Sequence, residues 1–174
     1  TRSWAASPDL LLLISETVKK TKPSLVVELG SGVSTLVSAK SGARKVVSID
    51  NSEEYGAKTR DLLKEHKVRG VEIRIAPLRP YANGSDWYDI STIKDLKKID
   101  LLIVDGPPGS KNPEARYPAF KEFKDKLSAK AVIIIDDVNR GGERKLAEDF
   151  AKSLPNHTLT ILDHEKGTAV ISPR

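Results

Sequence analysis

The hydrophobic positions of the chain gather into short runs, each bounded by polar or turn-forming residues. Several of these runs are almost continuously apolar, which is typical of strands that are covered on both faces of a sheet. The run 71–76 alternates apolar and polar residues, as a strand does when its two faces differ. The patterns together predict strands at 25–29, 45–50, 71–76, 99–105 and 131–136.

The stretches between these strands have the mixed polarity of helices that cover a sheet. The first helix is predicted to begin with Ser7 as its capping residue and Pro8 in its first turn, and to end before Pro23. Further helices are predicted from the glycines near residue 30 to about residue 42, and at about 52–66, 91–97, 116–128 and 143–153.

A hairpin is predicted at the carboxyl end, where the runs 158–163 and 168–172 flank the sequence HEKG. Two neighbouring strands joined by a tight turn must be antiparallel, whereas strands separated by helices are usually parallel. The alternation therefore predicts an α/β fold. We expect a Rossmann-like, doubly wound, seven-stranded sheet that is mostly parallel and has an antiparallel strand in the C-terminal hairpin.

The length of 174 residues suits one core, so we expect a single domain over residues 1–174. The chain has no methionine and begins with Thr1, from which we expect that an N-terminal region is missing. Hydrophobic residues make up 39% of the chain, and no apolar run approaches the roughly 18 residues of a membrane helix. We expect no membrane span and a cytoplasmic location, while the oligomeric state stays open.

The absence of cysteine excludes disulfide bonds, thiolate zinc sites and a cysteine nucleophile. The net charge of +5 is compatible with an anionic partner such as nucleic acid. However, the 29 basic residues are interleaved with 24 acidic residues, and no basic block contains aromatic residues. We therefore expect a small-molecule partner rather than a nucleic acid.

The sequence VVELGSGVSTL, at 26–36, joins the first strand to the following helix through a glycine turn. Gly30 and Gly32 let the backbone bend and approach a ligand closely. Asp50 follows Gly30 at the end of the second strand, where an acid can accept hydrogen bonds from both ribose hydroxyl groups. This pattern predicts a ribose-containing cofactor and leaves NAD and S-adenosylmethionine open.

Three further features favour the adenosyl cofactor. The dinucleotide fingerprint requires Gly or Ala at position 35, where this chain has Thr35. The carboxylate of Glu28 would repel a pyrophosphate, but it suits a cofactor that carries an ammonium and a sulfonium group. The terminal hairpin after five strand–helix units is the third feature.

With these features the chain resembles the class I S-adenosylmethionine-dependent methyltransferases over nearly its whole length. VVELGSG resembles their first motif, VVSID the second, IDLLIVDGPPG the fourth and AVIIIDD the fifth. The combination of SWAASPDLLLLI, ELGSGVSTL, DGPPG, ARYPA and IIIDDVNR is similar to a bacterial and archaeal subgroup whose substrates are poorly defined. The resemblance implies cofactor contacts by Glu28, Gly30, Ser31, Gly32, Ser34, Asp50, Asn51 and Asp105.

One departure from the family concerns the adenine ring. Many members carry an acid after the third strand, whereas this chain has Ala76, Pro77 and Leu78 there. Adenine is therefore expected to bind through backbone and apolar contacts, or through residues later in the chain.

Three acids follow two neighbouring predicted strands: Asp105 after one, and Asp136 and Asp137 after the next. Their carboxylates can converge at the sheet edge and suit Mg²⁺, as in the similar metal site of catechol-type and sugar O-methyltransferases. A metal would lower the pKa of an acceptor hydroxyl group, and Asp105 and Asp136 are the candidate catalytic residues. Equally, Asp105 could contact the ammonium group of the cofactor, while the other two acids cap the next helix or pair with Arg140.

The sequence DGPPG lacks the aromatic residue that stacks on a flipped base in enzymes that methylate nucleic acids. We therefore expect methyl transfer to an oxygen of a small molecule or sugar. The alternatives are a binding module without catalysis, or a methyltransferase that acts on nucleic acid or protein.

Trp87 and Tyr88 are candidates for lining the acceptor pocket, and Trp4 for a lid over the cofactor. Arg116 could bind an anionic acceptor, although a solvated loop is the commoner case.

Overall fold

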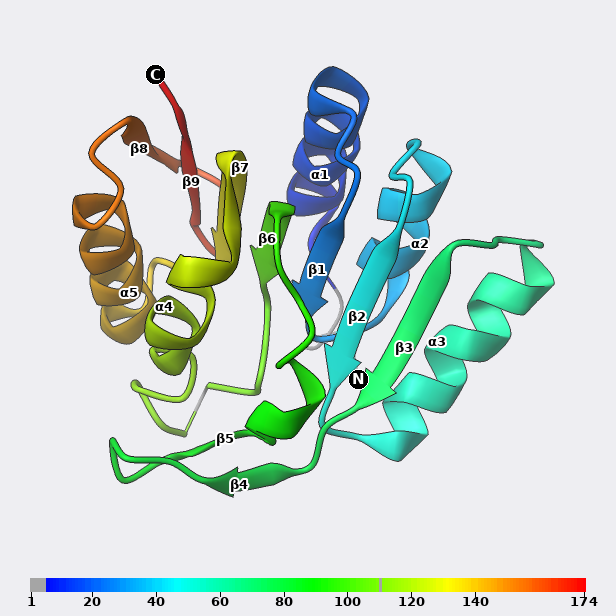
Figure 1. Ribbon diagram of the computed structural model, residues 1–174, viewed down its shortest axis with the longest axis horizontal. Helices are drawn as coiled ribbons and strands as arrows, with labels where there is room; N and C mark the ends of the chain where they lie inside the picture. The colour runs from blue at the N-terminus through cyan, green and yellow to red at the C-terminus, as the bar shows by residue number, and fades with distance from the viewer. Residues whose placement is uncertain (1–5, 110) are drawn as a thin grey trace.

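The computed structural model describes residues 6–109 and 111–174, so the predicted lid residue Trp4 lies outside the described part. A seven-stranded sheet with the order β3-β2-β1-β6-β7-β9-β8 forms the centre of the fold (Figure 1). Its strands are β1 (Val26–Leu29), β2 (Val46–Asp50), β3 (Val71–Ile75), β6 (Ile99–Val104), β7 (Leu127–Asp136), β8 (His157–Leu162) and β9 (Thr168–Pro173).

The strand directions agree with the predicted Rossmann-like sheet. The pairs β1–β2, β2–β3, β1–β6 and β6–β7 are parallel, and β9 is antiparallel to both of its neighbours, β7 and β8. The chain adds β2 and β3 on one side of β1 and then crosses over to add β6 on the other side. The strand order therefore reverses beside β1. Ligands of open α/β sheets bind at such a switch point, beyond the carboxyl ends of the strands.

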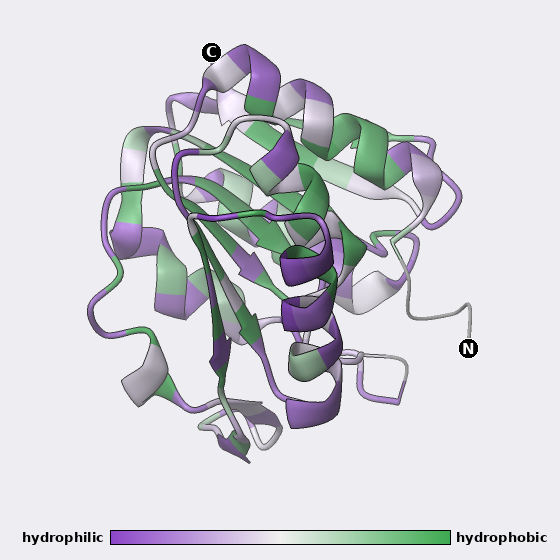
Figure 2. Ribbon diagram, turned by 90° about the vertical axis from the view of Figure 1, so that its right-hand side faces the viewer, coloured by the Kyte–Doolittle hydropathy of each residue, from purple (hydrophilic) through white to green (hydrophobic). Residues whose placement is uncertain are grey.

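Helices cover both faces of the sheet. On one face α1 packs against α2, and α2 against α3; on the other face α4 packs against α5. The helix bounds are α1 (Pro8–Thr21), α2 (Val33–Lys40), α3 (Glu53–Glu65), α4 (Pro118–Phe123) and α5 (Gly141–Lys152). In Figure 2 the hydrophobic colour concentrates on the strands between the helix layers.

The apolar spacing of the sequence explains how each helix docks. Leu10, Ile14 and Val18 are four residues apart, so they share one face of α1, and each is almost fully buried against the sheet. On the opposite face, Phe123 of α4 and Phe150 of α5 belong to the larger core cluster. No helix in the described part of the chain is long and apolar enough to span a membrane.

Three local predictions need correction. The predicted loop after β3 contains a small antiparallel ribbon, β4 (Leu78–Pro80) with β5 (Asp86–Tyr88). The short helix expected at 91–97 is a single 3₁₀ turn at Ile90–Thr92. The helix expected at 116–128 is α4 followed by the 3₁₀ turn Lys124–Lys126, after which β7 begins earlier than predicted.

Candidate functional site

The glycine turn after β1 brings two strand ends into direct backbone contact. Gly30 has φ +95°, and a Cβ atom at this position would lie 2.7 Å from the carbonyl oxygen of Asp105. The amide of Gly30 donates to the carbonyl oxygen of Ile49 at 2.7 Å. A side chain at position 30 would therefore push apart the carboxyl ends of β1 and β6, which form the floor of the switch point.

Glu28 lies beneath this turn and is fully buried. Its Oε1 atom accepts hydrogen bonds from the Thr35 hydroxyl group and from Ser48 Oγ, the latter at 3.0 Å. The Thr35 oxygen also accepts from the amide of Gly32 at 3.1 Å. Thr35, the residue that departs from the dinucleotide fingerprint, thus ties the start of α2 to β1 through Glu28.

The second carboxylate oxygen of Glu28, Oε2, has no hydrogen-bond partner among the described residues. Burial raises the pKa of Glu28 from 4.5 to about 7, and the hydrogen bonds from Thr35 and Ser48 oppose that rise. The side chain does not line the neighbouring cavity. In this arrangement Glu28 supports the turn from below.

Asp50 ends β2 and holds the tip of the glycine turn. Its Oδ2 atom accepts from the amide of Ser31 at 3.1 Å and from the Ser31 hydroxyl group, and its Oδ1 atom accepts from the amide of Ser52 at 2.9 Å. The carboxylate is therefore fixed in place at the cavity wall, where it can accept from a ribose.

A cavity of about 360 Å³ lies at the carboxyl edge of the sheet, beside the ends of β1, β2 and β6. It is lined by Gly30, Ser31, Asp50, Asn51, Ser52, Tyr55, Tyr88, Asp105, Gly106, Pro107, Pro108, Gly109, Arg116, Asp137, Arg140 and Lys166. Five of the predicted cofactor residues are in this wall, and Glu28, Gly32 and Ser34 are not. Since no ligand position tests these assignments, all eight stay predictions.

The three predicted acids do converge. One carboxylate oxygen from each of Asp105, Asp136 and Asp137 lies within 4.8 Å of the others. Asp136 is 1% exposed, and neither of its oxygens has a hydrogen-bond partner among the described residues. Burial raises the pKa of Asp105 well above its ordinary value, and repulsion by Asp136 adds to this rise.

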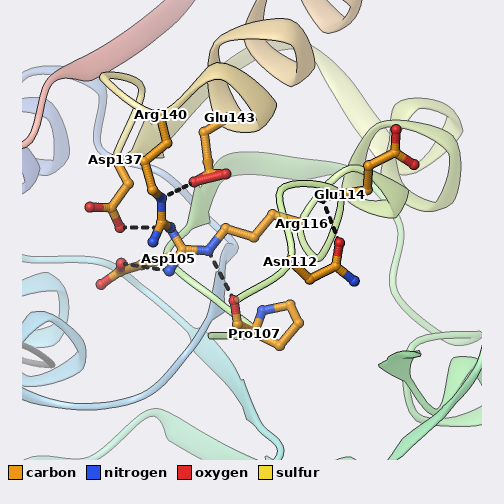
Figure 3. A network of polar contacts seen from close by, with 8 residues as sticks. All are labelled: Asp105, Pro107, Asn112, Glu114, Arg116, Asp137, Arg140 and Glu143. Atoms are coloured by element: carbon orange, nitrogen blue, oxygen red, sulfur yellow. Dashed lines mark hydrogen bonds and ion pairs between the residues drawn. The ribbon is translucent and has the colours of Figure 1, made fainter. Parts of the chain in front are cut away.

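Two arginines, Arg116 and Arg140, stand against Asp105 and Asp137 (Figure 3). Arg116 donates to Asp137 Oδ2 at 2.8 Å, lies 3.8 Å from Asp105 Oδ1 and donates through Nε to the carbonyl oxygen of Pro107 at 3.0 Å. Arg140 Nη2 donates to the same Asp137 oxygen at 3.3 Å. The predicted pairing with Arg140 is therefore present for Asp137, and the prediction of a metal remains untested.

Arg116 differs from the expected solvated loop residue, because its side chain is only 7% exposed and is paired with two acids. Of the two candidate aromatic residues, Tyr88 lines the cavity and Trp87 does not. Tyr55 and Lys166 also line the cavity, and sequence reasoning did not name them. Tyr55 lies in the first turn of α3, directly after the end of β2, and this position could have indicated that it lines the cavity.

Comparisons with known proteins show the family and agree with the fold. The model of a family described as "Methyltransferase domain" matches residues 27–138. The O-methyltransferase of Bacillus cereus, solved with S-adenosylhomocysteine, has 17% identity and a TM-score of 0.77 over 99% of this chain and 84% of its own. The O-methyltransferase TomG of Streptomyces achromogenes, solved with S-adenosylmethionine, has 16% identity and a TM-score of 0.76 over 98% and 82%.

A curated relative is the 54 kDa signal recognition particle protein of Pyrobaculum arsenaticum, which is 32% identical over 89 residues. The match covers 49% of this chain and 21% of that protein, so the chain spans about a fifth of the relative's length. A match of this extent does not transfer that protein's role to this chain.

Proposed function

Because this chain belongs to the methyltransferase family whose model matches residues 27–138, we propose that it transfers a methyl group from S-adenosylmethionine to an oxygen of a small molecule or sugar. One observation carries the proposal: the cavity at the switch point has carboxylates on two sides, Asp50 at the end of β2 and Asp105 after β6. A cofactor with two ribose hydroxyl groups and two positive charges matches such a wall.

The residues of the cavity fit this cofactor. Gly30 keeps the floor free of side chains, and Asp50 is placed to accept from the ribose hydroxyl groups. Ser31 and Asn51 complete the same wall. In this proposal Glu28, Gly32 and Ser34 contribute by shaping the turn. The cofactor supplies an electrophilic methyl group on a sulfonium.

The acid cluster supports an oxygen acceptor. Asp105 lines the cavity and has the unpartnered carboxylate of Asp136 behind it, so this pair can accept the proton that an acceptor hydroxyl group loses as its oxygen attacks. Arg116 donates to Asp137 and lies 3.8 Å from Asp105, which helps to position the Asp105 carboxylate at the cavity wall. The O-methyltransferases among the structural neighbours support the same acceptor class.

Assistance by Mg²⁺ is the finer part of this proposal. The observation in its favour is Asp136, a buried carboxylate whose two oxygens have no protein hydrogen-bond partner in the described part of the chain. Asp105, Asp136 and Asp137 would hold the ion, which would lower the pKa of the acceptor hydroxyl group and orient it. Arg116 and Arg140 already neutralise part of the negative charge of the acids through Asp137, so less of that charge remains for a cation to neutralise.

The test is turnover of methyl-labelled S-adenosylmethionine with a panel of catechols, sugars, amines, DNA and protein. The proposal expects labelled ethers from hydroxyl acceptors and a loss of about 10²-fold or more in Asp105→Asn, which removes the proton-accepting charge. Label transfer confined to DNA or protein would contradict it. Cofactor binding without any transfer would favour the alternative of a binding module.

A further inference from the structure

The β4–β5 ribbon, which the sequence pattern did not predict, delivers one side chain to the cavity. Tyr88 is the last residue of β5, is 2% exposed and lines the cavity wall. The ring of Trp87 packs edge-on against it, with 4.9 Å between ring centroids. The aromatic pair fixes the direction of the Tyr88 side chain.

The hydroxyl group of Tyr88 lies over the floor of the switch point. A Cβ atom on Gly106 would collide with the Tyr88 hydroxyl oxygen and would lie 3.2 Å from both the Gly30 nitrogen and the Leu29 oxygen. A side chain at position 106 would therefore collide with the Tyr88 hydroxyl group, which lies beside the ends of β1 and β6. This position is the crevice in which the proposed cofactor sits.

The same hydroxyl group has no hydrogen-bond partner among the described residues. A buried hydroxyl group without a partner costs free energy, because it has given up its hydrogen bonds to water. Burial raises the pKa of the Tyr88 hydroxyl group well above its ordinary value, and repulsion by Asp50 adds to this effect. The group is therefore neutral and keeps a hydrogen that no described residue accepts.

We propose that Tyr88 is a further cofactor-binding residue, whose hydroxyl group donates a hydrogen bond to a ribose oxygen of the bound adenosyl cofactor. The ribose is the partner because Asp50, the expected acceptor for the ribose hydroxyl groups, lines the same cavity as Tyr88. The inference rests on the proposed function, since it needs an adenosyl cofactor in this cavity.

Tyr88→Phe separates this role from ordinary packing, because it keeps the ring and removes only the hydroxyl group. In the free protein the variant should have an unchanged or higher Tm, since an unpartnered polar group is removed. Its dissociation constant for S-adenosylhomocysteine, measured by calorimetry, should rise about threefold to tenfold, as for one lost neutral hydrogen bond.

Tyr81→Phe is the matched control. Tyr81 lies in the turn between β4 and β5 and does not line the cavity, so its variant should bind S-adenosylhomocysteine as the wild type does. Equal dissociation constants for the wild type and Tyr88→Phe would overturn the inference. If the wild type itself fails to bind S-adenosylhomocysteine, the proposed function fails instead, so the two failures are distinguishable.

Discussion

Glu28→Gln tests whether the carboxyl group beneath the glycine turn is buried in the way that the structure indicates. The pKa of Glu28 is raised from 4.5 to about 7, with burial as the main cause. An acid whose pKa is higher in the folded than in the unfolded state binds its proton more tightly when folded. The free energy of unfolding therefore falls as the pH rises from about 4.5 to about 7.

The size of the effect follows from these two pKa values. At about 1.4 kcal/mol for each pH unit, the interval corresponds to a loss of about 3 kcal/mol once Glu28 is ionised. Gln has nearly the same shape, keeps an oxygen for the hydrogen bonds from Thr35 and Ser48, and carries no charge. The variant should therefore be more stable than the wild type once Glu28 is ionised. About 3 kcal/mol is the upper limit of this difference in the free energy of unfolding, because the amide hydrogens of Gln need hydrogen-bond partners of their own.

The assay is thermal unfolding of both proteins between pH 5 and pH 8. At pH 8 the Tm of Glu28→Gln should be about 5–10 °C above that of the wild type, and at pH 5 the two should nearly agree. Glu54→Gln on the exposed surface of α3 is the matched control, with an expected change close to zero. Parallel pH profiles for the wild type and Glu28→Gln would refute the reasoning.

Three further predictions concern the cavity. Asp50→Ala should weaken S-adenosylhomocysteine binding by about 1.5–3 kcal/mol in calorimetry, as for lost hydrogen bonds to a charged group, and a change below about twofold would contradict this. Gly30→Ala should lower the free energy of unfolding in a urea titration by about 2 kcal/mol or more, because its Cβ atom would meet the Asp105 carbonyl oxygen; an unchanged midpoint would contradict the contact. MgCl₂ should raise the wild-type Tm in a concentration-dependent way, Asp136→Asn should lose this response, and Arg116→Met should enhance it; identical Tm values in MgCl₂ and EDTA would argue against the metal.

The sequence was sufficient to predict the central sheet and the glycine turn at its switch point. Almost continuously apolar runs such as 99–104 are long enough to predict buried strands, and a glycine turn followed by Asp50 marks the switch point. These signals are local, and the parallel direction of the strands follows from the helices between them, because parallel neighbours need a crossover connection. The seven-stranded sheet agrees with that prediction.

The sequence did not predict features that depend on contacts between distant segments. The strands of the β4–β5 ribbon have three residues each and lie among prolines and Gly84, so they have no measurable alternation. Arg116 stands in a polar loop sequence, and its burial depends on acids that follow two distant strands. Glu28 was expected to contact the cofactor, and this stays a prediction; its burial beneath the glycine turn was not foreseen, because strand periodicity alone does not distinguish the wall of a cavity from the support beneath it.

The central claim is that the cavity at the switch point binds an adenosyl sulfonium cofactor. Calorimetric titration of the wild type with S-adenosylmethionine, S-adenosylhomocysteine and NADH tests this claim most directly. The account predicts one-to-one binding of the first two ligands and no measurable binding of NADH. Tight binding of NADH without binding of S-adenosylhomocysteine would contradict it.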